Sequence, residues 1–239
     1  SKEKIKIYDE TSKEVQRKET LIEATATATT RGGYKHFMEK EIYEQPESIG
    51  NTINGRLGEN DVLDNIFGLG SSDAFKNIKR IQFVACGTSL HAAKTARKWF
   101  EDICETPCYI DFASEYRYRN PLVEENTLFV SISQSGETAD TLAALEYAKS
   151  KDYLGAVSIC NVPTSTMARD SDWKMFTNAG PEIGVASTKA FTTQLAALLM
   201  LAISIAKSQN INKEKRAEAT QDLRNTPSLL QEAFGLKAD

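Results

Sequence analysis

Two short segments of this chain bring small hydroxyl residues and glycine together where a strand is expected to pass into a helix. They are residues 86–89 (CGTS) and residues 133–138 (SQSGET). Helix N-termini present unpaired N–H groups and a partial positive charge, and Gly87 and Gly136 would let the backbone approach a bound oxygen closely. The side chains that could donate further hydrogen bonds are Ser89, Ser133, Gln134, Ser135 and Thr138. Because neither segment contains Lys or Arg, the pattern predicts a phosphate group held by neutral donors.

The two segments also have a purely structural interpretation, since serine and threonine are favoured at helix N-caps whatever the function. One such loop alone would not separate the two interpretations. In an open doubly wound sheet, however, ligands bind beyond the carboxyl ends of the strands, where the strand order reverses. With a flavodoxin-like order 2-1-3-4-5, that point lies between the first and third strands, which these segments follow. Two such loops at one crevice favour ligand binding.

A dinucleotide is the alternative ligand. Gly87 follows the first expected strand, and Asp111 falls near the end of the second, where a ribose-binding acid would lie. A GxGxxG motif needs three glycines, whereas residues 87–92 (GTSLHA) contain one, and the chain has no GxxxxGK[ST] motif. The sequence therefore favours a phosphate monoester.

A third loop, residues 178–189 (NAGPEIGVASTK), combines two glycines, a proline and small residues, and it could close over a sugar. The competing interpretation is a plain connection between a strand and a helix. Glu182 could act as a general base, although an exposed loop glutamate is the commoner outcome. His91 could reach the edge of the site, although a surface or packing histidine is more common. No residue is assigned a catalytic role from the sequence.

The elements that must position these loops follow from the apolar pattern. Strands are expected at 81–85, 108–112, 127–132, 154–160 and 174–177, and helices at 89–103, 138–150 and 188–208. The strands are mostly continuous apolar runs, which is typical of a parallel sheet covered on both faces. With right-handed crossovers, the sequence predicts an α/β fold: a doubly wound five-stranded parallel sheet flanked by helices.

The flanking segments are less regular. Residues 1–33 are polar, with strand-like pieces at 5–8 and 21–30. Residues 34–53 are helical in pattern, and Pro46 predicts a break near Gln45. Further helix is expected at 62–67, 72–78 and 212–234, the last kinked at Pro227.

Composition excludes several classes of function. The chain has 29 Lys and Arg against 33 Asp and Glu, a net charge of −4 without a basic run, which argues against a nucleic-acid partner. Four cysteines without a CxxC pair and two histidines offer few ligands for zinc, so no metal and no cofactor are expected. We expect free, buried thiols in a cytoplasmic protein, without a signal peptide. The apolar run at 195–206 is shorter than the roughly 20 residues that span a bilayer, which favours a buried helix over a membrane span.

Five segments of the chain resemble a known family. They are KEIYEQP (40–46), ACGTS (85–89), SQSGETADT (133–141), ICNV (159–162) and EIGVASTKAFTTQ (182–194). In this order they are similar to the isomerase domain of the glucosamine-6-phosphate synthases, also called glutamine–fructose-6-phosphate aminotransferases (isomerising). SQSGETADT alone would indicate the sugar-isomerase (SIS) superfamily, whereas the full set is typical of the synthases.

The resemblance implies roles for particular residues. Ser89, Ser133, Gln134, Ser135 and Thr138 would hold the substrate phosphate, and Gly87, Thr88, Val185, Ala186 and Ser187 would lie on the sugar side. It also implies a division of the chain: 1–33 as the tail of a glutaminase domain and linker, 34–78 as N-terminal helices of the isomerase domain, 79–210 as the first SIS domain, and 211–239 as a helix leading toward a second SIS lobe.

The function implied is binding of fructose 6-phosphate for its conversion, with glutamine-derived ammonia, to glucosamine 6-phosphate. The sequence lacks the N-terminal cysteine of the glutaminase domain, and it lacks the second lobe that supplies the Schiff-base lysine, so we expect it to be inactive by itself. The family also implies a homodimer. A non-catalytic SIS-type sugar-phosphate sensor is the alternative that loop chemistry alone does not exclude.

Overall fold

A computed structural model describes residues 6–16 and 30–235, and its centre is a five-stranded parallel sheet. The strands are β3 (Arg80–Ala85), β4 (Cys108–Phe112), β5 (Thr127–Ile132), β6 (Gly155–Cys160) and β7 (Trp173–Phe176). Their order across the sheet is β4-β3-β5-β6-β7, and every neighbouring pair is parallel. This confirms the predicted doubly wound sheet, with the order reversing between β3 and β5.

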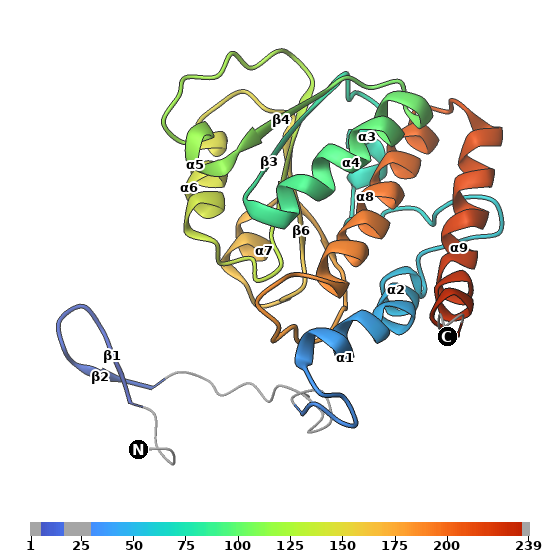
Figure 1. The fold of residues 1–239 in the computed structure, drawn as a ribbon. Helices are drawn as coiled ribbons and strands as arrows, with labels where there is room; N and C mark the ends of the chain where they lie inside the picture. The colour runs from blue at the N-terminus through green and yellow to red at the C-terminus, as the bar shows by residue number, and fades with distance from the viewer. Residues whose placement is uncertain (1–5, 17–29, 236–239) are drawn as a thin grey trace.

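Helices cover both faces of the sheet (Figure 1). One face carries α4 (Gly87–Ile103) and the long α8 (Lys189–Ser208), and the other carries α5 (Ala113–Tyr116), α6 (Ala139–Lys149) and α7 (Thr166–Asp170). Successive residues of a strand point to opposite faces. Phe83 of β3 accordingly packs in the core beneath α4 and α8, whereas Val84 packs in the core beneath α5 and α6.

Helix α8 contains the apolar run predicted to be buried. Among the described residues it is the one helix long and apolar enough to cross a membrane, but 78% of its apolar window is buried inside the protein. Its large side chains pack against α4 and the sheet, with Leu198, Leu201 and Ile205 fully buried. The helix is therefore a core element, as expected.

A second group of helices lies outside α8. Helix α1 (Phe37–Tyr43) is followed at once by α2 (Gln45–Ile53), and Pro46 stands in the first turn of α2, where its missing N–H costs nothing. The predicted break near Gln45 is confirmed. Helix α9 (Lys213–Gly235) packs against α2 and α8 and continues through Pro227.

The prediction of helix at 62–67 is wrong. Val62 forms an isolated antiparallel bridge with Leu57, and residues 64–67 are turns, with Asn65 at a positive φ of 54°. Val62 and Phe67 are both buried. Each holds an irregular segment against the core, so their spacing does not mark the apolar face of a helix. The helix expected at 72–78 is present in shorter form as α3 (Ser71–Phe75).

Near the N-terminus, β1 (Ile7–Tyr8) pairs with β2 (Glu14–Val15) in an antiparallel hairpin. The first of the two strand-like pieces, at 5–8, thus contains a strand at Ile7–Tyr8. The second, at 21–30, lies outside the described residues except for its last position.

Candidate functional site

A cavity of about 300 Å³ lies beyond the carboxyl ends of β3 and β5, where the strand order reverses. Its lining comes from three loops and the end of β5: Cys86, Thr88, Ser89, Ile132, Ser133, Gln134, Ser135, Thr138, Glu182, Gly184, Val185 and Ser187. A cavity of the same size lies at the amino-terminal end of β6, beside Lys149, Lys151 and Asp172. Cavity size therefore does not identify the binding site. The chemistry of the lining residues has to identify it.

The loop after β5 is a tight turn closed by its own side chains. The Ser133 hydroxyl lies 2.9 Å from the Thr138 hydroxyl and accepts the Gly136 N–H at 3.0 Å. The Ser135 hydroxyl accepts the Glu137 N–H at 3.1 Å. Because each hydroxyl oxygen has two lone pairs and one proton, these bonds fix the hydroxyls without using all of their hydrogen-bonding capacity.

The same turn is anchored to the neighbouring connection between β6 and α7. The Met167 N–H donates to the Gly136 carbonyl at 3.1 Å, and the Glu137 carboxylate accepts the Thr166 N–H at 2.7 Å. Gly136 has a φ of +67°, and a Cβ added there would lie 2.3 Å from the Ser165 hydroxyl oxygen. The turn therefore requires glycine at this position for both conformation and space.

The loop after β3 is shorter. Cys86 is the N-cap of α4, Gly87 follows with a φ of +55°, and Thr88 is exposed. Neither the N-cap of α4 nor Thr138, the N-cap of α6, makes a side-chain capping hydrogen bond. Helix capping therefore does not explain the side chains of Cys86 and Thr138. The N-termini of α4 and α6 both lie at this cavity, an arrangement suited to an oxyanion.

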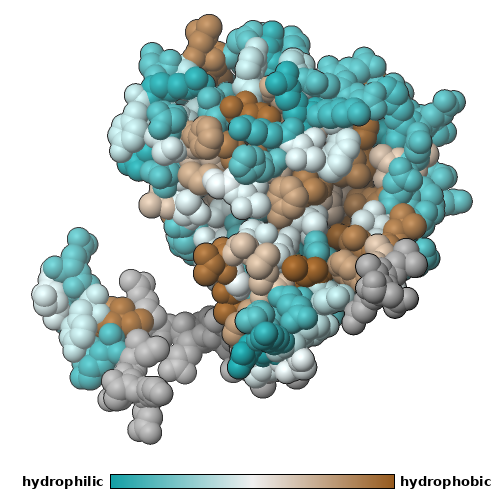
Figure 2. Space-filling model, in the orientation of Figure 1, coloured by the Kyte–Doolittle hydropathy of each residue, from teal (hydrophilic) through white to brown (hydrophobic). Residues whose placement is uncertain are grey.

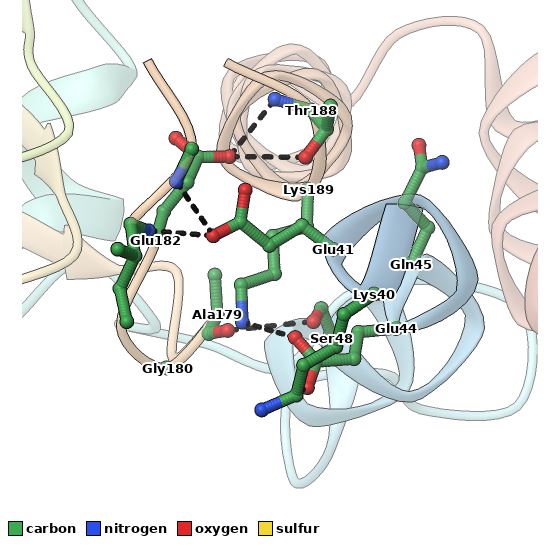
Figure 3. A network of polar contacts seen from close by, with 12 residues as sticks. Lys40, Glu41, Glu44, Gln45, Ser48, Ala179, Gly180, Glu182, Thr188 and Lys189 are labelled. Carbon is green, nitrogen blue, oxygen red and sulfur yellow. Dashed lines mark hydrogen bonds and ion pairs between the residues drawn. The ribbon is translucent and has the colours of Figure 1, made fainter. Parts of the chain in front are cut away.

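The third side of the cavity is the loop from Gly180 to Thr188. Glu182 is half-buried, and its Oε1 accepts the N–H group of Thr188 at 2.9 Å (Figure 3). It also accepts the N–H group of Ala190 at 3.1 Å, so Glu182 caps α8. Val185 is fully exposed at the cavity rim. The glutamate weighed as a general base is thus held by the backbone of its own loop, although it also lines the cavity.

Most of the residues singled out from the sequence come together here. All five of the expected phosphate ligands line the cavity, together with Thr88, Val185 and Ser187. Gly87 and Ala186 belong to the same loops but do not line it. Cys86, Ile132, Glu182 and Gly184 line it without having been assigned to it, and the first two directly precede the residues that were.

Two alternative residues lie elsewhere. Asp111 accepts hydrogen bonds from Gln82 Nε2 at 2.9 Å and Arg119 Nη2 at 2.5 Å, and it does not line the cavity. A ribose would have to compete with that arginine for the carboxylate, which disfavours the dinucleotide hypothesis. His91 is exposed on α4 and also lies outside the lining.

The buried thiols offer no nucleophile. Burial raises the pKa of the Cys104 thiol to about 12, and it also raises the pKa values of Cys108 and Cys160. Because the thiolate is the reactive form, these three cysteines are structural. Within residues 6–16 and 30–235, no cluster of His, Cys, Asp and Glu could hold a metal ion.

Comparison with known proteins gives a consistent picture. Residues 74–204 match the SIS domain family. The chain is 47% identical over 238 residues to the glutamine–fructose-6-phosphate aminotransferase (isomerizing) of Pseudomonas putida, covering 99% of this chain and 39% of that relative. It is 49% identical over 232 residues to the protein of the same name from Idiomarina loihiensis, covering 97% of this chain and 38% of the relative. The chain thus spans well under half the length of these curated relatives.

Solved structures agree. The C-terminal domain of glucosamine-fructose-6-phosphate aminotransferase from Francisella tularensis superposes with a TM-score of 0.83 at 47% identity, covering 87% of this chain and 58% of that one. A putative phosphosugar isomerase from Silicibacter pomeroyi shares the fold, with a TM-score of 0.69 at 24% identity over 82% of this chain and 56% of that chain.

Proposed function

This chain belongs to the SIS domain family, and from that premise we propose that the cavity between the loops after β3 and β5 binds the phosphate of fructose 6-phosphate. The observation that supports this most strongly is that two helix N-termini, of α4 and α6, lie at one cavity lined with hydroxyl and amide groups. Backbone N–H groups and neutral side chains would hold the oxyanion, as each helix dipole favours negative charge at its N-terminus.

The proposed ligands divide between the two ends of the substrate. Ser89, Ser133, Gln134, Ser135 and Thr138 would bind the phosphate, whereas Gly87, Thr88, Val185, Ala186 and Ser187 would lie beside the sugar. The loop from Gly180 to Thr188 forms the sugar side, opposite the loop after β5. In this arrangement the phosphate fixes one end of the ligand and leaves the sugar carbons facing outward from the sheet.

We assign the chain to the substrate-phosphate half of a glutamine–fructose-6-phosphate aminotransferase, a cytoplasmic enzyme of amino-sugar biosynthesis. The product would be glucosamine 6-phosphate. Nearly half of the residues are identical to such an enzyme over almost the whole of this chain, so the similarity extends beyond residues 74–204 of the SIS match. That breadth supports the enzyme over a sugar-phosphate sensor, which would need only the cavity loops.

Calorimetric titration with fructose 6-phosphate, inorganic phosphate and NAD tests this proposal. Fructose 6-phosphate should bind, and phosphate should compete with it, because the site recognises the oxyanion itself. Ser135→Ala should weaken fructose 6-phosphate about 10- to 150-fold, since a hydrogen bond to a charged acceptor contributes about 1.5–3 kcal/mol. Ser150→Ala, at the far end of α6, is the matched control and should bind as the parent does.

The dinucleotide hypothesis gives the opposite pattern. NAD binding that is lost in Asp111→Ala, with no response to either phosphate compound, would overturn the proposal. Under the proposed function Asp111→Ala leaves sugar-phosphate affinity unchanged, because that carboxylate is bonded to Arg119 and Gln82 away from the cavity.

Exposed apolar surface supports a homodimer. Figure 2 shows hydrophobic residues gathered across the middle of one face, with hydrophilic residues around its rim. Phe191, Leu195 and Leu199 recur every four residues along α8 and remain partly exposed. On α1, Met38 and Tyr43 are exposed beside an apolar hollow.

Sedimentation equilibrium at micromolar concentration should therefore give the mass of a dimer. Leu195→Asp should shift the population to monomer, because it places a charge between Phe191 and Leu199 on the partly exposed apolar face of α8. Thr95→Asp, on the exposed face of α4, is the control and should stay dimeric. A parent chain that sediments only as monomer contradicts this prediction.

A further inference from the structure

Helix α1 buries a carboxylate against the loop on the sugar side of the cavity. Glu41 is only 2% exposed, and its Oε1 accepts the N–H groups of Ile183 at 2.5 Å and Gly184 at 2.9 Å (Figure 3). The acceptor and the two donors are more than 140 residues apart in sequence. One carboxylate oxygen thus fixes two successive peptide groups of the loop.

The space around Gly184 is fitted to this carboxylate. A Cβ added to Gly184 would lie 2.5 Å from Glu41 Oε2 and 3.5 Å from the Cα of Met38. A side chain at this position would therefore displace the Glu41 carboxylate, whereas its contact with the Met38 Cα would be ordinary. Gly184 also lines the cavity, and Val185 and Ser187 follow it there, so the contact lies directly behind the cavity wall.

Further contacts hold the rest of the loop against α1 and α2. Lys189, which begins α8 and is itself buried, forms an ion pair of 2.7 Å with Glu44 between the two helices. Just before the loop, the Thr52 hydroxyl donates to the Thr177 carbonyl at 2.5 Å. These contacts tie down the two ends, whereas Glu41 is bonded to the central part that faces the cavity.

The second oxygen of Glu41 is buried without a hydrogen-bond partner among the described residues. A buried carboxylate is costly, and a half-satisfied one more so. An apolar residue at this position of α1 would avoid that cost but would release the two loop N–H groups. The carboxylate at position 41 is thus explained by its hydrogen bonds to the loop N–H groups, and not by a contribution to the stability of α1.

We propose that Glu41 is a positioning residue for the sugar side of the site. By fixing the backbone of Ile183 and Gly184, it sets where Val185 and Ser187 stand relative to the sugar. The phosphate side is built from the loops after β3 and β5, to which Glu41 makes no hydrogen bond. This inference rests on the proposed function, and it predicts that the two ends of the ligand respond differently to changes at Glu41.

The test is Glu41→Ala, titrated with fructose 6-phosphate and with inorganic phosphate. Loss of two hydrogen bonds to a charged acceptor should free the loop and weaken fructose 6-phosphate about tenfold or more. Phosphate affinity should stay that of the parent. Amide hydrogen exchange should accelerate at residues 183–188 and remain slow at 133–138. Glu41→Gln keeps an oxygen acceptor for both N–H groups and should restore sugar-phosphate affinity.

Asp172→Ala is the matched control. Its carboxylate also accepts a backbone N–H, from Ala156 at 2.8 Å, but at the amino-terminal end of β6. It should lower thermal stability without changing either affinity. Unchanged fructose 6-phosphate affinity in Glu41→Ala, an equal loss for both ligands, or failure of Glu41→Gln to restore binding would each overturn the assignment. A parent chain that binds neither ligand would instead refute the proposed function, so the two failures are distinguishable.

Discussion

Gly136→Ala is expected to abolish binding of both fructose 6-phosphate and inorganic phosphate. Gly136 has a φ of +67°, a conformation that costs an L-residue roughly 1–2 kcal/mol. The new Cβ would also lie 2.3 Å from the Ser165 hydroxyl oxygen and 2.6 Å from the Ser165 Cβ. Ser165 is buried and caps α7, so it has no room to move. The turn must therefore shift, and Ser133, Ser135 and Thr138 shift with it.

Calorimetry with both ligands measures this effect, and circular dichroism checks that the sheet persists. Gly70→Ala is the matched control: Gly70 also has a left-handed φ, of +79°, but nothing lies within 4 Å of an added Cβ. It should be somewhat less stable and bind as the parent does. Combining Gly136→Ala with Ser165→Gly removes the clash and should recover part of the affinity. Parent-like phosphate affinity in Gly136→Ala would mean that the turn after β5 does not hold the phosphate.

Phe83→Ala should lower the free energy of unfolding by about 3–5 kcal/mol, the usual range for emptying a buried phenylalanine site. Phe83 lies at the centre of β3 with no exposed surface, and its ring meets that of Phe100 on α4 edge-to-face at 5.1 Å between centroids. This contact holds α4, which begins at the cavity, against β3, which ends at the cavity. Denaturant unfolding followed by circular dichroism measures the loss.

Tyr109→Ala, on the edge strand β4, is the control for this core substitution. The Tyr109 side chain is half exposed. Its removal should therefore lower the free energy of unfolding by much less than Phe83→Ala does. Equal losses in the two variants would contradict the assignment of Phe83 to the main core. Below the unfolding transition, Phe83→Ala should still bind phosphate, because no cavity residue is changed.

The sheet was predictable because its signal is local. Each strand is an apolar run bounded by polar or turn residues, and burial on both faces demands such runs. The expected strand at 154–160 is Gly155–Cys160, and that at 174–177 is Trp173–Phe176, so the ends differ by a single residue. The failure at 62–67 has the opposite origin. There, two buried side chains anchor an irregular segment, and apolar spacing over six residues does not distinguish that from a helix turn.

The sequence by itself predicted which residues could bind a phosphate, since hydroxyl, amide and glycine types at the starts of two helices are a local pattern. It also determined that both loops meet at one edge, because parallel strands end on the same side of a sheet. Only the tertiary structure decided how the third loop is held. Glu182 caps α8, and Glu41 on α1 fixes the peptide groups of Ile183 and Gly184. The Glu182 contact is local, but whether a loop glutamate turns back to the helix start depends on the loop's conformation. The Glu41 contact has no sequence signature, because periodicity carries no information about a partner 142 residues away.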